Sequence, residues 1–186
     1  GYTLLFLHDA IITAKYSGKV NYGPEAFAPI AATGEIGLVI AVADDSPFKT
    51  LGQLLEKAKA EPNTIVNGVN MGAPSHFASL RLEHAYPGAK FRFTQAGDGN
   101  DRVLKMVGAH IKVAAFSTTE YLNFKPQGIR ALCYFGPTRH AAIPDIPTAV
   151  EQGVHAEEVN MQYWWAPKGT PPDRVKYMAG VLKKAL

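Results

Sequence analysis

Apolar and polar positions recur with two different periods along the chain, and these periods predict helices and strands in alternation. The clearest helix is predicted over residues 50–60. Its apolar side chains recur at i, i+3, i+4 and i+7, which places them on one helical face: Leu51, Leu54, Leu55 and Ala58. Thr50 is a plausible N-cap for this helix, and Pro62 lies just beyond its end.

Short apolar runs bounded by glycine, proline or polar residues predict the strands, at residues 3–8, 27–32, 37–43, 64–67, 91–94, 111–116, 129–135 and 162–165. Further helices are predicted at about 75–86 and 100–107, and a last one begins after the Pro171-Pro172 pair. Strands that alternate with helices of this length predict an α/β fold with doubly wound, mostly parallel sheets and right-handed crossovers.

Two polar stretches, at residues 43–47 and 151–160, divide the chain. We expect residues 44–158 to form one complete, compact α/β lobe that binds a ligand. Residues 1–43 and 159–186 hold three or four predicted strands and about one helix, too few to cover a sheet on both faces. We therefore interpret these ends as a partial second lobe, and the chain as a fragment of a longer protein.

Composition narrows the function classes. The chain has 186 residues, of which 47% are hydrophobic and 19% charged, as in an ordinary globular protein. Apolar runs such as residues 37–43 are far too short to span a bilayer. The net charge is +3 with both signs mixed along the chain, which does not favour nucleic acid as a partner. The single cysteine, Cys133, excludes an internal disulfide, and its apolar strand predicts a buried thiol.

Motifs for bound cofactors or metals are missing from the sequence. Gly97-Asp98-Gly99 resembles the start of a dinucleotide fingerprint, but Arg102 stands where the third glycine is needed. We find no Walker motif, no GxSxG nucleophile elbow and no histidine pair with metal-ligand spacing. We therefore expect no cofactor, no metal and no catalytic residue.

Two glycine-rich loops, at residues 68–76 and 95–101, each follow a predicted strand and lead into a helix. Ligands of open α/β sheets bind at such carboxyl ends, where N–H groups and the helix dipole attract anions. Ser75 can cap its helix or contact a ligand. In the second loop, Asp98 or Asn100 can cap the helix, or an aspartate can pair with a ligand ammonium or hydroxyl.

His8 and Asp9 end the first predicted strand, and an imidazole beside a carboxylate can share a proton. Adjacent strand residues point to opposite faces, however, so the pair is poorly placed for catalysis. For the same reason, one of Trp164 and Trp165 is expected in the core and the other near a cleft or the surface.

The order of several short segments along the chain resembles the tripartite tricarboxylate transporter receptor family. Residues 1–5 match the strand that precedes one of the ligand loops of this family. Seven further segments follow in family order, at residues 27–31, 46–51, 75–78, 108–111, 143–148, 151–153 and 166–172. Any one segment is a weak signal, but the ordered set covers the whole chain and is specific.

The resemblance implies a two-lobed architecture like that of periplasmic binding proteins, a periplasmic location, and delivery of ligand to membrane transporter subunits without chemical change. Ligands of the family are di- or tricarboxylates, acidic amino acids or aromatic acids. By position, the resemblance places ligand contacts at His8, Asp9, Ala10, Met71, Gly72, Ser75, His76, Ala96, Gly97, Asp98, Gly99, Asn100, Ser117 and Thr118.

The sequence also departs from the family. The usual aromatic-x-glycine arrangement of the second ligand loop is replaced by Gln95-Ala96-Gly97 and two aspartates. The family's signal peptide, its first strand with a ligand loop, and its C-terminal helices have no counterpart in these residues. Two alternatives stay open: the effector-sensing domain of a transcriptional regulator, and an enzyme built on His8, Asp9 or Asp98.

Overall fold

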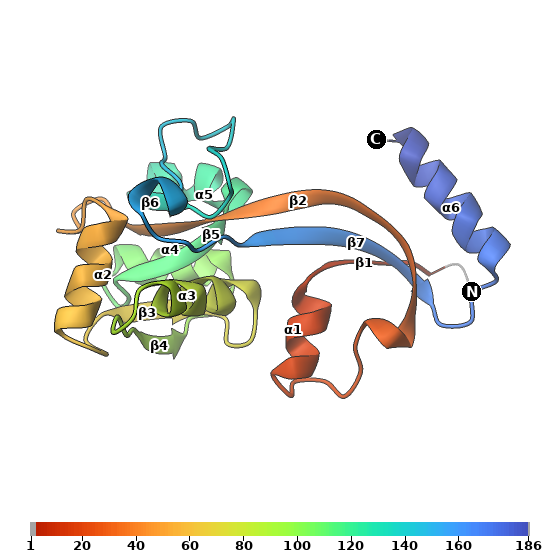
Figure 1. The fold of residues 1–186 in the computed structure, drawn as a ribbon, viewed down its shortest axis with the longest axis horizontal. Helices are drawn as coiled ribbons and strands as arrows, with labels where there is room; N and C mark the ends of the chain where they lie inside the picture. The colour runs from red at the N-terminus through yellow and green to blue at the C-terminus, as the bar shows by residue number, and fades with distance from the viewer. Residues whose placement is uncertain (1–2, 186) are drawn as a thin grey trace. The chain divides into compact units, whose positions relative to one another are not determined.

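The computed structural model describes residues 3–185, which form two compact units. The central unit comprises residues 37–159, and the terminal unit is formed by the chain on either side of it. Figure 1 shows the central unit as a sheet with helices on it, and the terminal unit with its own strands and helices. Residues 37–43, which we expected in the partial lobe, belong to the central unit.

The reason for this difference is a single long strand. Strand β2 (Phe27–Ala43) runs without interruption where the sequence predicts two strands. The Thr33-Gly34-Glu35 stretch reads as a break because it is polar and contains glycine. In the structure Thr33 instead accepts a hydrogen bond from the Trp164 indole N–H at 2.9 Å, so a polar side chain is satisfied within the strand.

The central sheet combines parallel and antiparallel pairs. Strand β3 (Val66–Val69) lies between β4 (Arg92–Gln95) and β5 (Val113–Ser117) and is parallel to both. Strand β2 runs antiparallel to β5 and also to β6 (Ile129–Tyr134). The parallel arrangement predicted from the sequence therefore holds for β5, β3 and β4, the last of which lies at the sheet edge, but not for β2.

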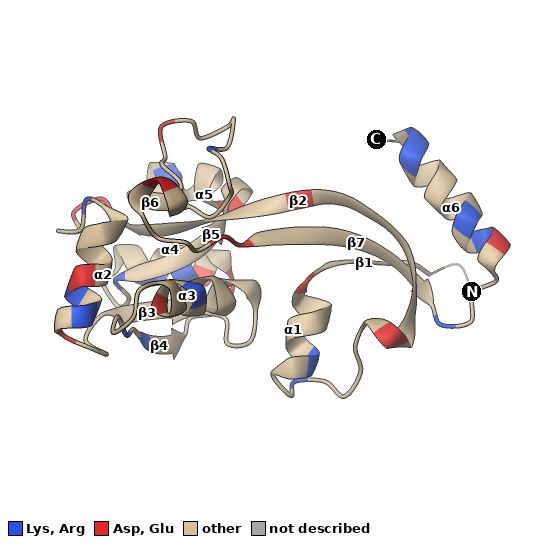
Figure 2. Ribbon diagram, viewed as in Figure 1, with Lys and Arg blue, Asp and Glu red and all other residues tan. Residues whose placement is uncertain are grey.

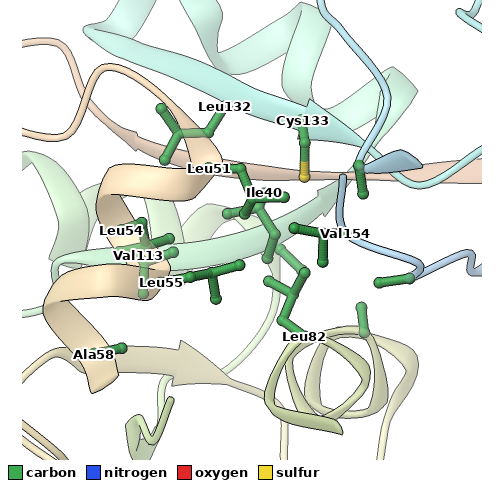
Figure 3. Packing of buried hydrophobic residues seen from close by; sticks show 14 of the residues in the cluster. Ile40, Leu51, Leu54, Leu55, Ala58, Leu82, Val113, Leu132, Cys133 and Val154 are labelled. Carbon is green, nitrogen blue, oxygen red and sulfur yellow. The ribbon is translucent and has the colours of Figure 1, made fainter. Parts of the chain in front are cut away.

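Helices cover both faces of this sheet. Helices α2 (Leu51–Ala60) and α3 (Pro74–Ala85) pack on one face, and Figure 3 shows the α2 side chains turned toward Ile40 and Val113. Thr50 caps α2, because its Oγ1 accepts the Gln53 N–H at 3.2 Å. Helices α4 (Gly99–Val107) and α5 (Thr118–Phe124) supply apolar residues to the second core cluster, on the other face. Two 3-10 turns, Lys125–Gln127 and Val150–Gln152, complete the unit.

Cys133 lies inside the first of these clusters with no exposed surface, as predicted. Its burial raises the pKa of the thiol to about 12. The thiol therefore stays protonated at neutral pH, and a structural role is favoured over a nucleophilic one.

The terminal unit is smaller. Strand β1 (Leu5–His8) pairs antiparallel with β7 (Val159–Pro167), which in turn neighbours β2. Its helices are α1 (Ala10–Tyr16), the 3-10 turn Pro24–Ala26 and α6 (Pro172–Ala185). Trp165 is buried and Trp164 is half-buried, in agreement with the strand alternation. Within the described residues, none of the helices has both the length and the apolar character that crossing a bilayer requires.

Candidate functional site

Three parallel strands of the central unit end at the same edge of the sheet. Strands β5, β3 and β4 are neighbours, and each leads through a short connection into α5, α3 or α4. Parallel neighbours carry their carboxyl ends on one side, so Ser75, Asn100 and Thr118 lie along the same edge. These three helix starts are the candidate site, and we call the loops before them the first (residues 70–73), second (96–98) and third (117–118) loops.

In the first loop, Ser75 is 7% exposed and does not cap its helix. The N-cap position belongs to Ala73, and the Ser75 hydroxyl instead accepts the Asn70 N–H at 3.1 Å. The Ser75 carbonyl accepts the hydroxyl of Ser79 at 3.1 Å. The side chain that sequence reasoning favoured as a cap or ligand contact therefore closes the first loop.

The next three amides of the first loop also donate within the protein: that of Met71 to Gln95 Oε1 at 2.8 Å, that of Gly72 to His76 Nδ1 at 3.2 Å and that of Ala73 to the Asn70 carbonyl at 2.9 Å. Four successive N–H groups thus have protein acceptors. Residues 70–73 therefore offer no spare amide donor before α3, and the Gln95 and His76 side chains account for two of these four hydrogen bonds.

The second loop differs from the first in the hydrogen bonding of its backbone N–H groups. Asp98 is the N-cap of α4, and its Oδ1 accepts the Asp101 N–H at 3.1 Å, which confirms the capping interpretation for this aspartate. Gly97 has a positive φ of 81°, a conformation that favours glycine. Among the residues that the structure describes, the N–H groups of residues 97–100 have no hydrogen-bond acceptor. Asp98 and Asn100 are exposed, Gly97 is half-buried, and Gly99 between them is buried.

Two cations from α4 hold the carbonyls of the second loop. Arg102 Nη1 donates to the Gly97 carbonyl at 3.0 Å, and Lys105 Nζ donates to the Ala96 carbonyl at 3.2 Å. Arg102 is only 6% exposed, and its guanidinium lies 5.3 Å from the centre of the Phe116 ring. Burial lowers the pKa of Arg102, while nearby carboxylates, that of Glu120 most of all, act in the opposite direction.

The third loop is closed by a capping box. Ser117 Oγ accepts the Glu120 N–H at 3.1 Å, and Glu120 Oε2 accepts the Ser117 N–H at 2.8 Å. Thr118 is buried, and its hydroxyl donates to the Gly37 carbonyl at 3.1 Å. The sequence analysis missed α5, although Ser117 followed three residues later by Glu120 is a recognised signature of a helix start.

Gly99 brings the second and third loops together. A Cβ built on Gly99 would overlap the carboxylate of Glu120 and contact the Phe124 ring. The absence of a side chain therefore lets the start of α4 approach α5 closely, as glycine does at tight helix contacts.

His8, Asp9 and Ala10 lie in the terminal unit, where β1 passes into α1. The Ala10 N–H donates to His8 Nδ1 at 3.1 Å, and Asp9 Oδ2 accepts the Met161 N–H at 2.9 Å. Burial, together with the nearby Asp9, raises the pKa of Tyr163. Helix α1, which was not predicted from the sequence, begins at Ala10.

Tyr134 is a neighbour of the candidate site that sequence reasoning missed. Strand β6 runs in the same direction as β5, because both are antiparallel to β2, so its carboxyl end reaches the candidate edge. The Tyr134 ring occupies the space beside Gly37 and Gly136, where a Cβ on either glycine would overlap it. In the sequence Tyr134 looks like any other apolar strand residue.

A cavity of about 460 Å³ lies elsewhere in the central unit, between the C-terminal part of α2 and the end of α4. Its lining is mostly apolar and includes Phe48, Ile65 and Met106. Lys57 at its rim is already paired with Glu61 at 2.6 Å. The second loop, with four successive amide donors, is better suited to an anion than this cavity. Within the described residues, no group of three or more His, Cys, Asp or Glu side chains could hold a metal ion.

Comparison with known proteins places this arrangement in a family. The model of a family described as "Tripartite tricarboxylate transporter family receptor" matches residues 1–186. A protein of the gbd 5′ region of Cupriavidus necator is 28% identical over 194 residues, covering 100% of this chain and 57% of its own length. The chain thus spans little more than half of this curated relative.

Solved structures share the fold. MatC from Rhodopseudomonas palustris with bound malate has a TM-score of 0.84 at 19% identity, covering 98% of this chain and 64% of that one. A second R. palustris protein, solved with adipate, has a TM-score of 0.85 at 18% identity, covering 98% and 62%. The chain therefore has the α/β fold of periplasmic binding proteins and spans about two thirds of these structures.

Proposed function

Because the chain belongs to the tripartite tricarboxylate transporter receptor family, we propose that it binds a small carboxylate at the candidate edge of the central sheet. One observation carries this proposal: the N–H groups of residues 97–100 point to no protein acceptor within the described residues. Carboxylate oxygens accept hydrogen bonds from such N–H groups, and the dipole of α4 also attracts a negative charge to this helix start. Each hydrogen bond to a charged group contributes about 1.5–3 kcal/mol.

Dicarboxylates are the ligands that we favour. Two proteins of the same fold were solved with malate and with adipate, and both of these ligands carry two carboxylates. One carboxylate would bind the amides of the second loop. The rest of the ligand would contact the amide or hydroxyl of Ser75, beside the first loop, and residues 117–118 of the third loop. From the family resemblance, His8, Asp9 and Ala10 of the terminal unit are further proposed contact residues.

The proposal also covers the cellular location of the protein and its transporter partner. A receptor of this family would work in the periplasm and hand its ligand, unchanged, to membrane transporter subunits. The ligand would then leave as it arrived, so we expect binding without turnover. Incubation with each carboxylate followed by mass spectrometry would test this directly, because a product of altered mass would contradict a receptor role.

The second loop can be tested by removing one amide donor. Asn100 occupies the first turn of α4, where proline fits a helix and lacks only its N–H. We expect Asn100→Pro to weaken malate or adipate binding about tenfold, which corresponds to about 1.4 kcal/mol. Asn100→Ala keeps the amide and should bind like the wild type. The measurement is isothermal titration calorimetry with a panel of mono-, di- and tricarboxylates.

Two results would contradict the proposal. The first is a wild-type protein that binds no member of the panel. The second is equal affinity of Asn100→Pro and Asn100→Ala for a carboxylate that the wild type binds.

A further inference from the structure

Arg102 is a cation buried in the central unit. It is 6% exposed, and its Nε has no hydrogen-bond partner among the described residues. Burying a guanidinium is costly unless its donors are used well, and an apolar side chain of similar volume often serves stability equally well. The geometry of the remaining donors suggests what the charge contributes.

The first contact fixes the orientation of a peptide plane. In a trans peptide the C=O and the following N–H point in opposite directions. Arg102 Nη1 holds the Gly97 carbonyl at 3.0 Å, so the Asp98 N–H of the same peptide is turned away from the guanidinium. Lys105 holds the preceding carbonyl, that of Ala96, at 3.2 Å and orients the Gly97 N–H in the same manner. Two of the four free donors are therefore aimed by side chains of α4.

The second contact reaches the third loop. Arg102 Nη2 lies 3.6 Å from Glu120 Oε1, and the other oxygen of that carboxylate accepts the Ser117 N–H at 2.8 Å. One guanidinium thus connects Gly97 in the second loop with the capping box of the third. The Phe116 ring, 5.3 Å away, supports the guanidinium from the end of β5.

We propose that Arg102 is a positioning residue, which aims the amides of the second loop at a carboxylate ligand and couples that loop to the third. This inference rests on the proposed function and deepens it. Arg102 and Lys105 also offset part of the negative charge of the nearby Asp98, Asp101 and Glu120, which repels an anion.

The test compares Arg102→Gln and Arg102→Lys with the control Arg130→Gln. Arg130 also donates to backbone carbonyls, those of Ser46 and Phe48, but it lies at the end of β6 that is opposite to the candidate edge. One measurement is amide hydrogen exchange in the ligand-free protein, read at Asp101 for the second loop and at Ser117 and Glu120 for the third. The other is affinity for malate and adipate by calorimetry.

We expect Arg102→Gln to accelerate exchange at all three amides and to weaken carboxylate binding about tenfold or more, while exchange within β3 and β5 stays slow. Arg102→Lys keeps the charge but loses the forked geometry, because one ammonium cannot serve Gly97 and Glu120 together. It should loosen at least one loop and keep part of the affinity. If Arg102→Gln fails to fold, the lysine variant carries the test by the same measurements.

Unchanged exchange at Asp101, Ser117 and Glu120 would overturn the proposal, and so would an equal effect of Arg130→Gln. A wild-type chain that binds no carboxylate would instead remove the proposed function. In that case the exchange measurement still decides whether Arg102 positions the two loops.

Discussion

At the scale of residues, hydrogen-bond partners decide which groups remain for a ligand, and residue types alone do not reveal them. Ser75 is the residue type expected to contact an anion, yet its hydroxyl accepts the Asn70 N–H. Asp98 is unfavourable by type, yet it caps α4 and leaves the four amides of residues 97–100 without protein acceptors in the described chain. The two loops therefore differ in backbone conformation. In the second loop this conformation includes the positive φ of Gly97, and Arg102 and Lys105 hold the carbonyls of that loop.

Cys133 allows a prediction about pH at the same scale. Its pKa rises from 9.0 to about 12 on folding, so the folded state prefers the protonated thiol. The stability that depends on this thiol is fully present below pH 9 and is lost as the pH rises toward 12. We expect the wild type to lose about 1 kcal/mol more than Cys133→Ala between pH 7 and pH 10, as measured by urea unfolding. Identical pH dependence of the two proteins would show that the thiol ionises freely in the fold.

At the scale of elements, periodicity predicted most of the central unit. Helix α2 with its Thr50 cap, helix α4 and the three parallel strands are confirmed, with ends that shift by at most two residues. The short helices α1 and α5 were missed because seven residues give too little periodicity, and β2 was split at a polar stretch that its neighbours satisfy. Periodicity reads the side chains of one element, whereas these features depend on other elements.

The contact between α4 and α5 gives a prediction at this scale. A methyl group on Gly99 would displace the Glu120 carboxylate, so we expect Gly99→Ala to lower the free energy of unfolding by about 1–3 kcal/mol. Gly52→Ala is the matched control, because the nearest atom to its new Cβ is Thr50 Oγ1 at 3.8 Å. That change should raise stability by about 0.5–1 kcal/mol, since alanine favours a helix. Chemical unfolding of both variants would settle the comparison, and changes of the same sign would refute it.

At the scale of the whole molecule, the two units are built differently. The largest fully buried side chains, including Phe116, Phe135 and Leu82, all belong to the central unit. Helix α6 has no buried residue among those described, and Figure 2 shows Lys and Arg at both of its ends. The sequence indicated a compact middle and a smaller set of end segments, but it placed residues 37–43 with the ends. Where a chain crosses between units depends on strand pairing, which local sequence does not encode.

The central claim is that a carboxylate rests on the amides at the start of α4. The most direct measurement is a titration of the isotope-labelled protein with adipate or malate, followed through backbone amide chemical shifts. We predict the largest, saturable downfield shifts for residues 97–100, with smaller changes at Ser75. Saturable shifts confined to other residues, with residues 97–100 unchanged, would contradict this account.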